Sequence, residues 1–113
     1  MVKIYGIKTC GSVKKALTFL DKNNIAYTFI DFKKTPPTQE NLDFWLKHTE
    51  LKKLFNTKGT TYKKLALKDK NLSENEIKDY LLKEPMLIKR PVIECKSGVL
   101  VGFDEAIYGS TKW

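Results

Sequence analysis

Arginine is nearly absent from this chain. Among the 21 basic residues only Arg90 is an arginine and the others are lysines, although the formal net charge is +8. Proteins that read DNA bases depend on arginine, because its planar guanidinium makes two hydrogen bonds at once. The lysines are also scattered as on a solvated surface. We therefore expect no direct nucleic-acid binding, and the charge indicates an anionic small substrate or merely a lysine-rich surface.

Long apolar runs and metal-ligand clusters are missing as well. No run approaches the ~20 residues of a membrane span, and the first residues lack the apolar core of a signal peptide. Two cysteines and one histidine are too few for a zinc site. We therefore expect no metal, no membrane association and a cytoplasmic location, where thiols stay reduced. The 113 residues predict one globular domain over 1–113, expected to be a monomer.

The stretch around Cys10 is the most informative part of the chain. Val2 to Tyr5 is a short run typical of a strand, and a compact loop follows it. Apolar residues then recur at the spacing of an amphipathic helix from Val13 to Leu20. Cys10 is therefore predicted at a helix N-terminus, where unpaired N–H groups favour the thiolate. The residues alone leave two readings open, a reactive thiol or a buried structural cysteine.

Two sharper cysteine motifs can be excluded by counting. A dithiol redox centre needs a second cysteine three residues on, and that position is Val13. A Cys-x5-Arg anion loop needs an arginine six residues on, and that position is Ala16. If Cys10 reacts, it reacts as a lone thiol.

The rest of the chain predicts three groups of elements. Asn23-Asn24 ends the first helix and a second strand follows over 25–32, which makes a parallel strand–helix–strand unit the default. A helical block follows over about residues 38–84, with a capping box at Ser73–Glu76 and Pro85 beyond its end. The last part predicts a hairpin over 91–101 that turns at Gly98, then a short helix from Asp104 through Ile107. The sum is an α/β thioredoxin-like fold, a mixed four-stranded sheet with the helical block inserted.

This arrangement resembles the ArsC/Spx family, which comprises arsenate reductases, Spx transcriptional regulators and YffB-like proteins. The resemblance covers essentially the whole chain and depends on four segments in order: Tyr5–Cys10, Phe55–Tyr62, Lys89-Arg90-Pro91 and Val101-Gly102-Phe103. It favours a reactive Cys10 and implies that Pro91 is cis.

The resemblance also identifies departures from the family's arsenate site. Arsenate reductases use three arginines to bind the oxyanion, and the matching positions here are Lys58, Arg90 and Gly102. Lysine is a point charge without the planar fork of arginine, and glycine has no charge. Spx regulators usually carry the Cys-x-x-Cys switch that Val13 removes. The chain therefore looks most like the YffB-like branch, which implies glutathione-linked thiol reduction.

We accordingly expect a monothiol oxidoreductase in which Cys10 forms a mixed disulfide that glutathione or glutaredoxin resolves, on arsenate or another oxidised substrate. No cofactor is expected to be bound, and glutathione is the expected co-substrate. Ser12 is expected to cap the helix or, as a second option, to bind the thiolate. The residues expected to bind the substrate or glutathione are Lys8, Gly11, Ser12, Lys58, Arg90 and Pro91.

One alternative comes from another functional class, and one cysteine remains to be assigned. The alternative is a regulator that binds RNA polymerase without catalysis, as Spx does. Cys95 lies four residues past Pro91 along the predicted strand, about 13 Å at ~3.3 Å per residue. Because a disulfide needs Cα atoms within ~7 Å, we expect Cys95 to be structural rather than a partner of Cys10.

Overall fold

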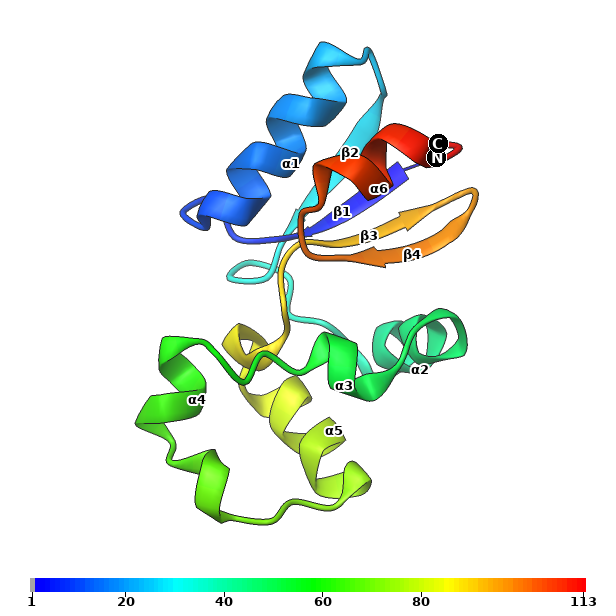
Figure 1. Ribbon diagram of the computed structural model, residues 1–113. Coiled ribbons are helices and arrows are strands. Elements are labelled where there is room, and N and C mark those ends of the chain that lie inside the picture. Colours follow the sequence, from blue (N-terminus) through cyan, green and yellow to red (C-terminus); the bar gives the residue numbers. More distant parts are fainter. Residues whose placement is uncertain (1) are drawn as a thin grey trace. The chain divides into compact units, whose positions relative to one another are not determined.

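The computed structural model describes residues 2–113, and the chain divides into two compact units (Figure 1). The first unit contains the chain up to Thr35 together with Arg90–Trp113, and the second is Pro36–Lys89. The first unit holds all the strands, and the second is the helical block inserted between them. The expectation of one folding domain over 1–113 stays a prediction.

The sheet of the first unit is mixed and four-stranded, as predicted. Its strands are β1 (Val2–Gly6), β2 (Tyr27–Asp31), β3 (Val92–Cys95) and β4 (Gly98–Val101), in the order β2-β1-β3-β4. The β1–β2 pair is parallel, and the β1–β3 and β3–β4 pairs are antiparallel. Gly98 has φ 127° at the hairpin turn, a conformation that favours glycine. This is the thioredoxin-like fold expected from the sequence.

The second strand is shorter than the predicted 25–32. Asn23 is the C-cap of α1 (Gly11–Lys22), and Asn24 adopts a left-handed conformation with φ 55°. The N–H of Ile25 then donates to the carbonyl of Leu20 at 2.9 Å. Ile25 therefore completes the turn that leaves the helix, and pairing with β1 begins only at Tyr27.

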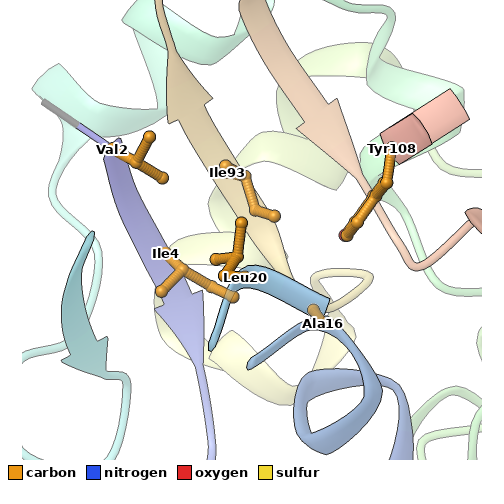
Figure 2. Close-up of a cluster of buried hydrophobic side chains, with 6 residues drawn as sticks. All are labelled: Val2, Ile4, Ala16, Leu20, Ile93 and Tyr108. Atoms are coloured by element: carbon orange, nitrogen blue, oxygen red, sulfur yellow. The ribbon is translucent and has the colours of Figure 1, made fainter. Parts of the chain in front are cut away.

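One face of the sheet carries the core of the first unit (Figure 2). Ile4 of β1 lies opposite Ile93 of β3, and α1 covers them with Ala16 and Leu20. The cluster is completed by Val2 and by Tyr108 of α6 (Glu105–Ser110), so both helices pack on this face. Ala16 and Leu20 belong to the apolar spacing that predicted this helix, so the structure confirms that face of α1 as the buried one.

The last helix continues past the predicted end at Ile107. Asp104 caps it as expected, because its carboxylate accepts from the N–H of Ile107 at 3.1 Å. The helix then runs to Ser110, since Tyr108 is buried and its ring contacts three other aromatic rings. Those rings lie 5.0–5.5 Å from it and belong to Phe19, Phe103 and Trp113. Aromatic packing from distant segments stabilises a turn that the local pattern did not predict.

Gly6 allows α1 to approach the end of β1 closely. A Cβ atom at residue 6 would lie 2.6 Å from Cγ2 of Val13, which is closer than van der Waals contact permits. We expect Gly6→Ala to lower the free energy of unfolding by about 1–3 kcal/mol, the usual cost of overpacking. Denaturant unfolding measures it. Gly109→Ala is the control, since a Cβ there meets nothing within 4 Å; an equal effect of both variants would contradict the close approach.

The second unit consists of helices, as predicted for the inserted block, joined by loops and by an isolated antiparallel bridge between Phe55 and Ile88. Thr38 and Ser73 close capping boxes at the starts of α2 (Gln39–His48) and α5 (Glu74–Lys83). The other helices are α3 (Leu51–Leu54), α4 (Thr60–Lys64), η1 (Leu67–Asp69) and η2 (Pro85–Leu87). The block extends beyond the predicted residue 84, because Pro85 ends α5 but also begins η2. Proline is favoured at a first helical position, where no N–H is needed.

The described residues form neither a membrane-spanning helix nor a cluster of metal-ligating side chains. No helix within 2–113 has the length and apolar character needed to cross a membrane. In the same range, no group of three or more His, Cys, Asp or Glu side chains could hold a metal ion.

Candidate active site

Cys10 is the N-cap residue of α1, where the sequence predicted it. Its backbone is extended, with φ −79° and ψ 126°, and its carbonyl accepts the first helical hydrogen bond from Lys14 at 3.0 Å. Its own N–H donates to the carbonyl of Ile7 at 3.3 Å, which closes the short loop after β1. The thiol is half-buried and not in a disulfide. It therefore lies beyond the carboxyl end of a strand and at the positive end of a helix dipole.

The surroundings of the Cys10 thiol favour its ionised form. Burial alone would raise the pKa of Cys10, because a charge is less well solvated there. The donors beside the thiol outweigh burial: the backbone N–H of Val13, the Arg90 side chain and the backbone N–H of Ser12 all lower the pKa, and the Arg90 charge adds to them. The pKa of Cys10 is thus lowered from its ordinary value. No capping hydrogen bond to the Cys10 side chain is formed in this structure, and these donors favour the thiolate because a charged acceptor attracts them more strongly than a thiol does.

Arg90 and Pro91 reach Cys10 from the other end of the first unit's sequence. The peptide bond between them is cis, as the resemblance implied. The carbonyl of Pro91 accepts from the N–H of Gly102 at 2.8 Å, and Val92 then pairs with Tyr5 of β1. The antiparallel β1–β3 pairing therefore brings the start of β3 to the edge where β1 ends. Tertiary structure unites two predicted site residues, Cys10 and Arg90, that are 80 positions apart.

The other predicted residues near Cys10 differ in their roles. Gly11 and Ser12 are the exposed first residues of α1, and Lys8 is exposed in the loop before it. The expectation that Ser12 caps the helix is wrong, because the cap position belongs to Cys10. Ser12 contributes its backbone N–H instead.

Lys58 belongs to the second unit, in the loop before α4. Its N–H donates to Oδ1 of Asn56 at 3.2 Å, and its side chain is exposed. The loop is supported by the edge-on contact between the rings of Phe55 and Tyr62, 5.5 Å apart. Its share in a site with Cys10 stays a prediction.

Cys95 and Gly102 are placed by β3 and β4. Both cysteines are free, and Cys95 pairs with Gly98 at the hairpin turn, one residue beyond the Lys3–Glu94 pair. Cys10 follows the opposite end of β1, so the expected separation of the thiols is confirmed. Gly102 has φ 80°, a conformation that is strained for other residues. An arginine at this position would need that strained backbone.

Sequence analysis did not identify Val13 as part of the site. Its side chain was counted as core and is fully buried. Its backbone N–H, however, makes the largest contribution among those that lower the pKa of Cys10. The position of Val13 in the sequence could have identified it, because an N-cap side chain accepts a hydrogen bond from the backbone N–H of the third helical residue.

Comparisons with known proteins agree with this architecture. The ArsC family model matches residues 5–111. The chain is 36% identical over 105 residues to the uncharacterised protein YusI of Bacillus subtilis, with 89% of each chain covered. The solved structure of a YffB protein matches with a TM-score of 0.89 and 36% identity, covering 97% of both chains.

More distant relatives carry names that indicate two different functions. An arsenate reductase of Rhizobium meliloti is 29% identical over 86% of this chain and 71% of its own. The global transcriptional regulator Spx 2 of Bacillus anthracis is 27% identical over 93% of this chain and 82% of its own. With the family model spanning nearly the whole sequence and Cys10 at the start of its first helix, this chain belongs to the ArsC family.

Proposed function

We propose that the protein is a monothiol oxidoreductase that uses Cys10 as its nucleophile and glutathione or glutaredoxin as the thiol that resolves the adduct. The observation that carries this is the set of donors at Cys10: the N–H groups of Val13 and Ser12 and the guanidinium of Arg90. Structural cysteines lack such donors, whereas reactive ones occupy electropositive, partly exposed positions. The half-buried thiol at the end of β1 meets that description.

The chemistry at Cys10 is two successive thiol–disulfide exchanges. The Cys10 thiolate attacks one sulfur of an oxidised substrate, which forms a mixed disulfide and releases the other sulfur as a thiolate. A glutathione or glutaredoxin thiolate then attacks the substrate-derived sulfur and returns Cys10 as a thiolate. The first step releases one half of the substrate as a thiol, and the second leaves the other half in a disulfide with the resolving thiol. A second glutathione thiolate, or the second thiol of glutaredoxin, then attacks the glutathione or glutaredoxin sulfur of that disulfide, which releases the reduced substrate and leaves the resolving thiols as a disulfide. The donors at Cys10 stabilise it as the leaving group of the second step, because a thiol of low pKa leaves faster.

Glutathione suits this site because it is an anion at neutral pH. The N-terminal end of α1 offers exposed Gly11 and Ser12, and Arg90 offers a fork that can hold a carboxylate with two hydrogen bonds. We propose Lys8 and Lys58 as further positive charges that bind glutathione, and Pro91 as a residue beside Cys10. These assignments concern binding, while Cys10 alone carries the covalent chemistry.

Arsenate reduction is a narrower version of the same function. The relatives named arsenate reductase favour it. Two positions argue against arsenate as the main substrate: Lys58 cannot make a bidentate clamp, and Gly102 has a backbone conformation, φ 80°, that an arginine would not readily adopt. We therefore favour a disulfide substrate over an oxyanion.

Regulation through RNA polymerase is the less favoured function. Relatives named Spx support it, and a partner role for RNA polymerase would follow from them. A Cys-x-x-Cys switch is impossible here, because the third residue after Cys10 is Val13, whose side chain is fully buried against Gly6. The donors around Cys10 favour a reactive thiolate, which catalysis needs and binding to a protein partner does not.

The pH dependence of Cys10 alkylation tests the proposed function. Because the surroundings lower the pKa of Cys10, the rate with iodoacetamide should reach half its maximum below the ~8.5 of a free thiol. The rate should fall as the pH falls through that midpoint, since the thiolate is lost. Peptide mapping separates Cys10 from Cys95, and the Cys10-containing peptide after unfolding gives the reference. A Cys10 midpoint at or above the unfolded value would remove the basis for catalysis.

A further inference from the structure

Two hydrogen bonds join the segment beside Cys10 to the buried hydroxyl of Tyr108. The Arg90 side chain lowers the pKa of Cys10, and Pro91 follows Arg90 directly in the chain. The carbonyl of Pro91 accepts from the N–H of Gly102 at 2.8 Å. The carbonyl of Gly102 in turn accepts from the hydroxyl of Tyr108 at 2.6 Å. Gly102 is thus held on both its polar backbone groups, by the residue after Arg90 and by the last helix.

Tyr108 is fixed more firmly than its place near the chain's end would suggest. Its ring is 1% exposed and belongs to the core cluster on α1's face of the sheet (Figure 2). The rings of Phe19, Phe103 and Trp113 contact it edge-on, and Nε1 of Trp113 donates to its carbonyl at 3.2 Å. Burial, then the charge of Asp104 and the Cys95 thiol, raises the pKa of Tyr108 well above its ordinary value. The hydroxyl therefore remains a donor wherever Cys10 titrates.

The backbone at Gly102 needs such support. With φ 80°, Gly102 has a conformation that glycine can adopt but that nothing in its own sequence enforces. Glycine also has more conformational freedom to lose than any other residue. The two hydrogen bonds restrict it from both sides. A loose Gly102 would leave the Pro91 carbonyl, and with it the Arg90 backbone, free to shift by the small displacements that disturb catalytic geometry.

We propose that Tyr108 is a positioning residue, which holds the Arg90–Pro91 segment against Cys10 through Gly102 without touching the substrate itself. The hydroxyl of Tyr108 then positions the active site, while its ring packs in the core. This inference rests on the proposed function only in taking Cys10 as the reacting atom.

Tyr108→Phe tests this role because it removes the hydroxyl and keeps the ring. The Cys10 alkylation midpoint should rise by roughly half a pH unit, a part of the ~1–3 units that a lost neighbouring charge can cause. The control is Tyr27→Phe, which removes a hydroxyl bonded to Asp21 at 3.0 Å on the exposed side of the same unit. It should leave the midpoint unchanged. In an Arg90→Ala background, Tyr108→Phe should add no further rise, because the hydroxyl acts through Arg90.

A second measurement keeps the inference testable should Tyr108→Phe fail to fold. In the unaltered protein, the Gly102 amide resonance should shift with the same midpoint as the Cys10 thiol, since the two are joined through Arg90 and Pro91. A Gly102 resonance that stays flat through that titration would overturn the positioning role. So would a folded Tyr108→Phe variant with the wild-type midpoint. A wild-type midpoint at the free-thiol value would instead overturn the proposed function, so the two failures are distinguishable.

Discussion

Oxidised glutathione should leave a single glutathione attached to the protein, on Cys10. The donors at Cys10 lower the pKa of its thiol and so favour the reactive thiolate, whereas Cys95 lies at the hairpin turn against the core cluster. Cys10→Ser should therefore abolish the adduct and all glutathione-dependent reduction of a mixed-disulfide peptide. Intact-protein mass spectrometry followed by peptide mapping measures the adduct, and absorbance of the released thiol measures turnover.

Cys95→Ser is the matched control for that result. It removes the other cysteine and should keep both the adduct and the activity. The sheet register explains why the two thiols do not combine: β3 runs antiparallel to β1, so Cys95 lies beyond the Lys3–Glu94 pair while Cys10 follows Gly6. The length of β1 alone is about 13 Å at ~3.3 Å per residue, against the ~7 Å limit for Cα atoms in a disulfide. An internal Cys10–Cys95 bridge would refute the monothiol mechanism.

Arg90→Ala should have the second large effect, on glutathione binding and on Cys10 together. It removes a hydrogen bond and a charge that favour the thiolate, so the alkylation midpoint should rise. It also removes the fork proposed to hold a glutathione carboxylate. The loss of one charged contact costs about 1.5–3 kcal/mol, which weakens binding about tenfold or more. Isothermal titration with the Cys10→Ser protein measures binding without adduct formation.

Two further variants separate charge from geometry in that result. Arg90→Lys keeps the charge and loses the planar fork. Its alkylation midpoint should therefore lie between those of the wild type and Arg90→Ala, while its glutathione binding should stay almost as weak as that of Arg90→Ala. Lys58→Ala should weaken glutathione binding and leave the Cys10 midpoint unchanged, because Lys58 is not among the groups that set that pKa. Unchanged glutathione binding in both alanine variants, with the proteins folded, would show that glutathione binds elsewhere.

The sequence by itself determined the elements and the position of the nucleophile. Local patterns were sufficient where neighbouring residues decide the conformation: the apolar spacing of α1, the capping box at Ser73, and the glycine turn at Gly98. Cys10 was predicted at the start of α1 for the same reason, since a strand, a loop and a helix follow one another within a few residues. The helix dipole at Cys10 is therefore a property that can be read along the chain.

Tertiary structure alone decided what else surrounds the thiol and where several elements end. The family resemblance led us to expect Arg90 in the site, but the register of β1 with β3 is what brings it to Cys10, since no local pattern encodes contacts across 80 positions. The ring packing of Tyr108 extended α6 beyond Ile107, and the turn at Asn24 shortened β2. Hydrogen bonds and packing between distant segments fix these features, because a side chain's environment depends on which elements meet and not on its neighbours in sequence. The pKa of Cys10 is set by both levels, its helix locally and its arginine through the fold.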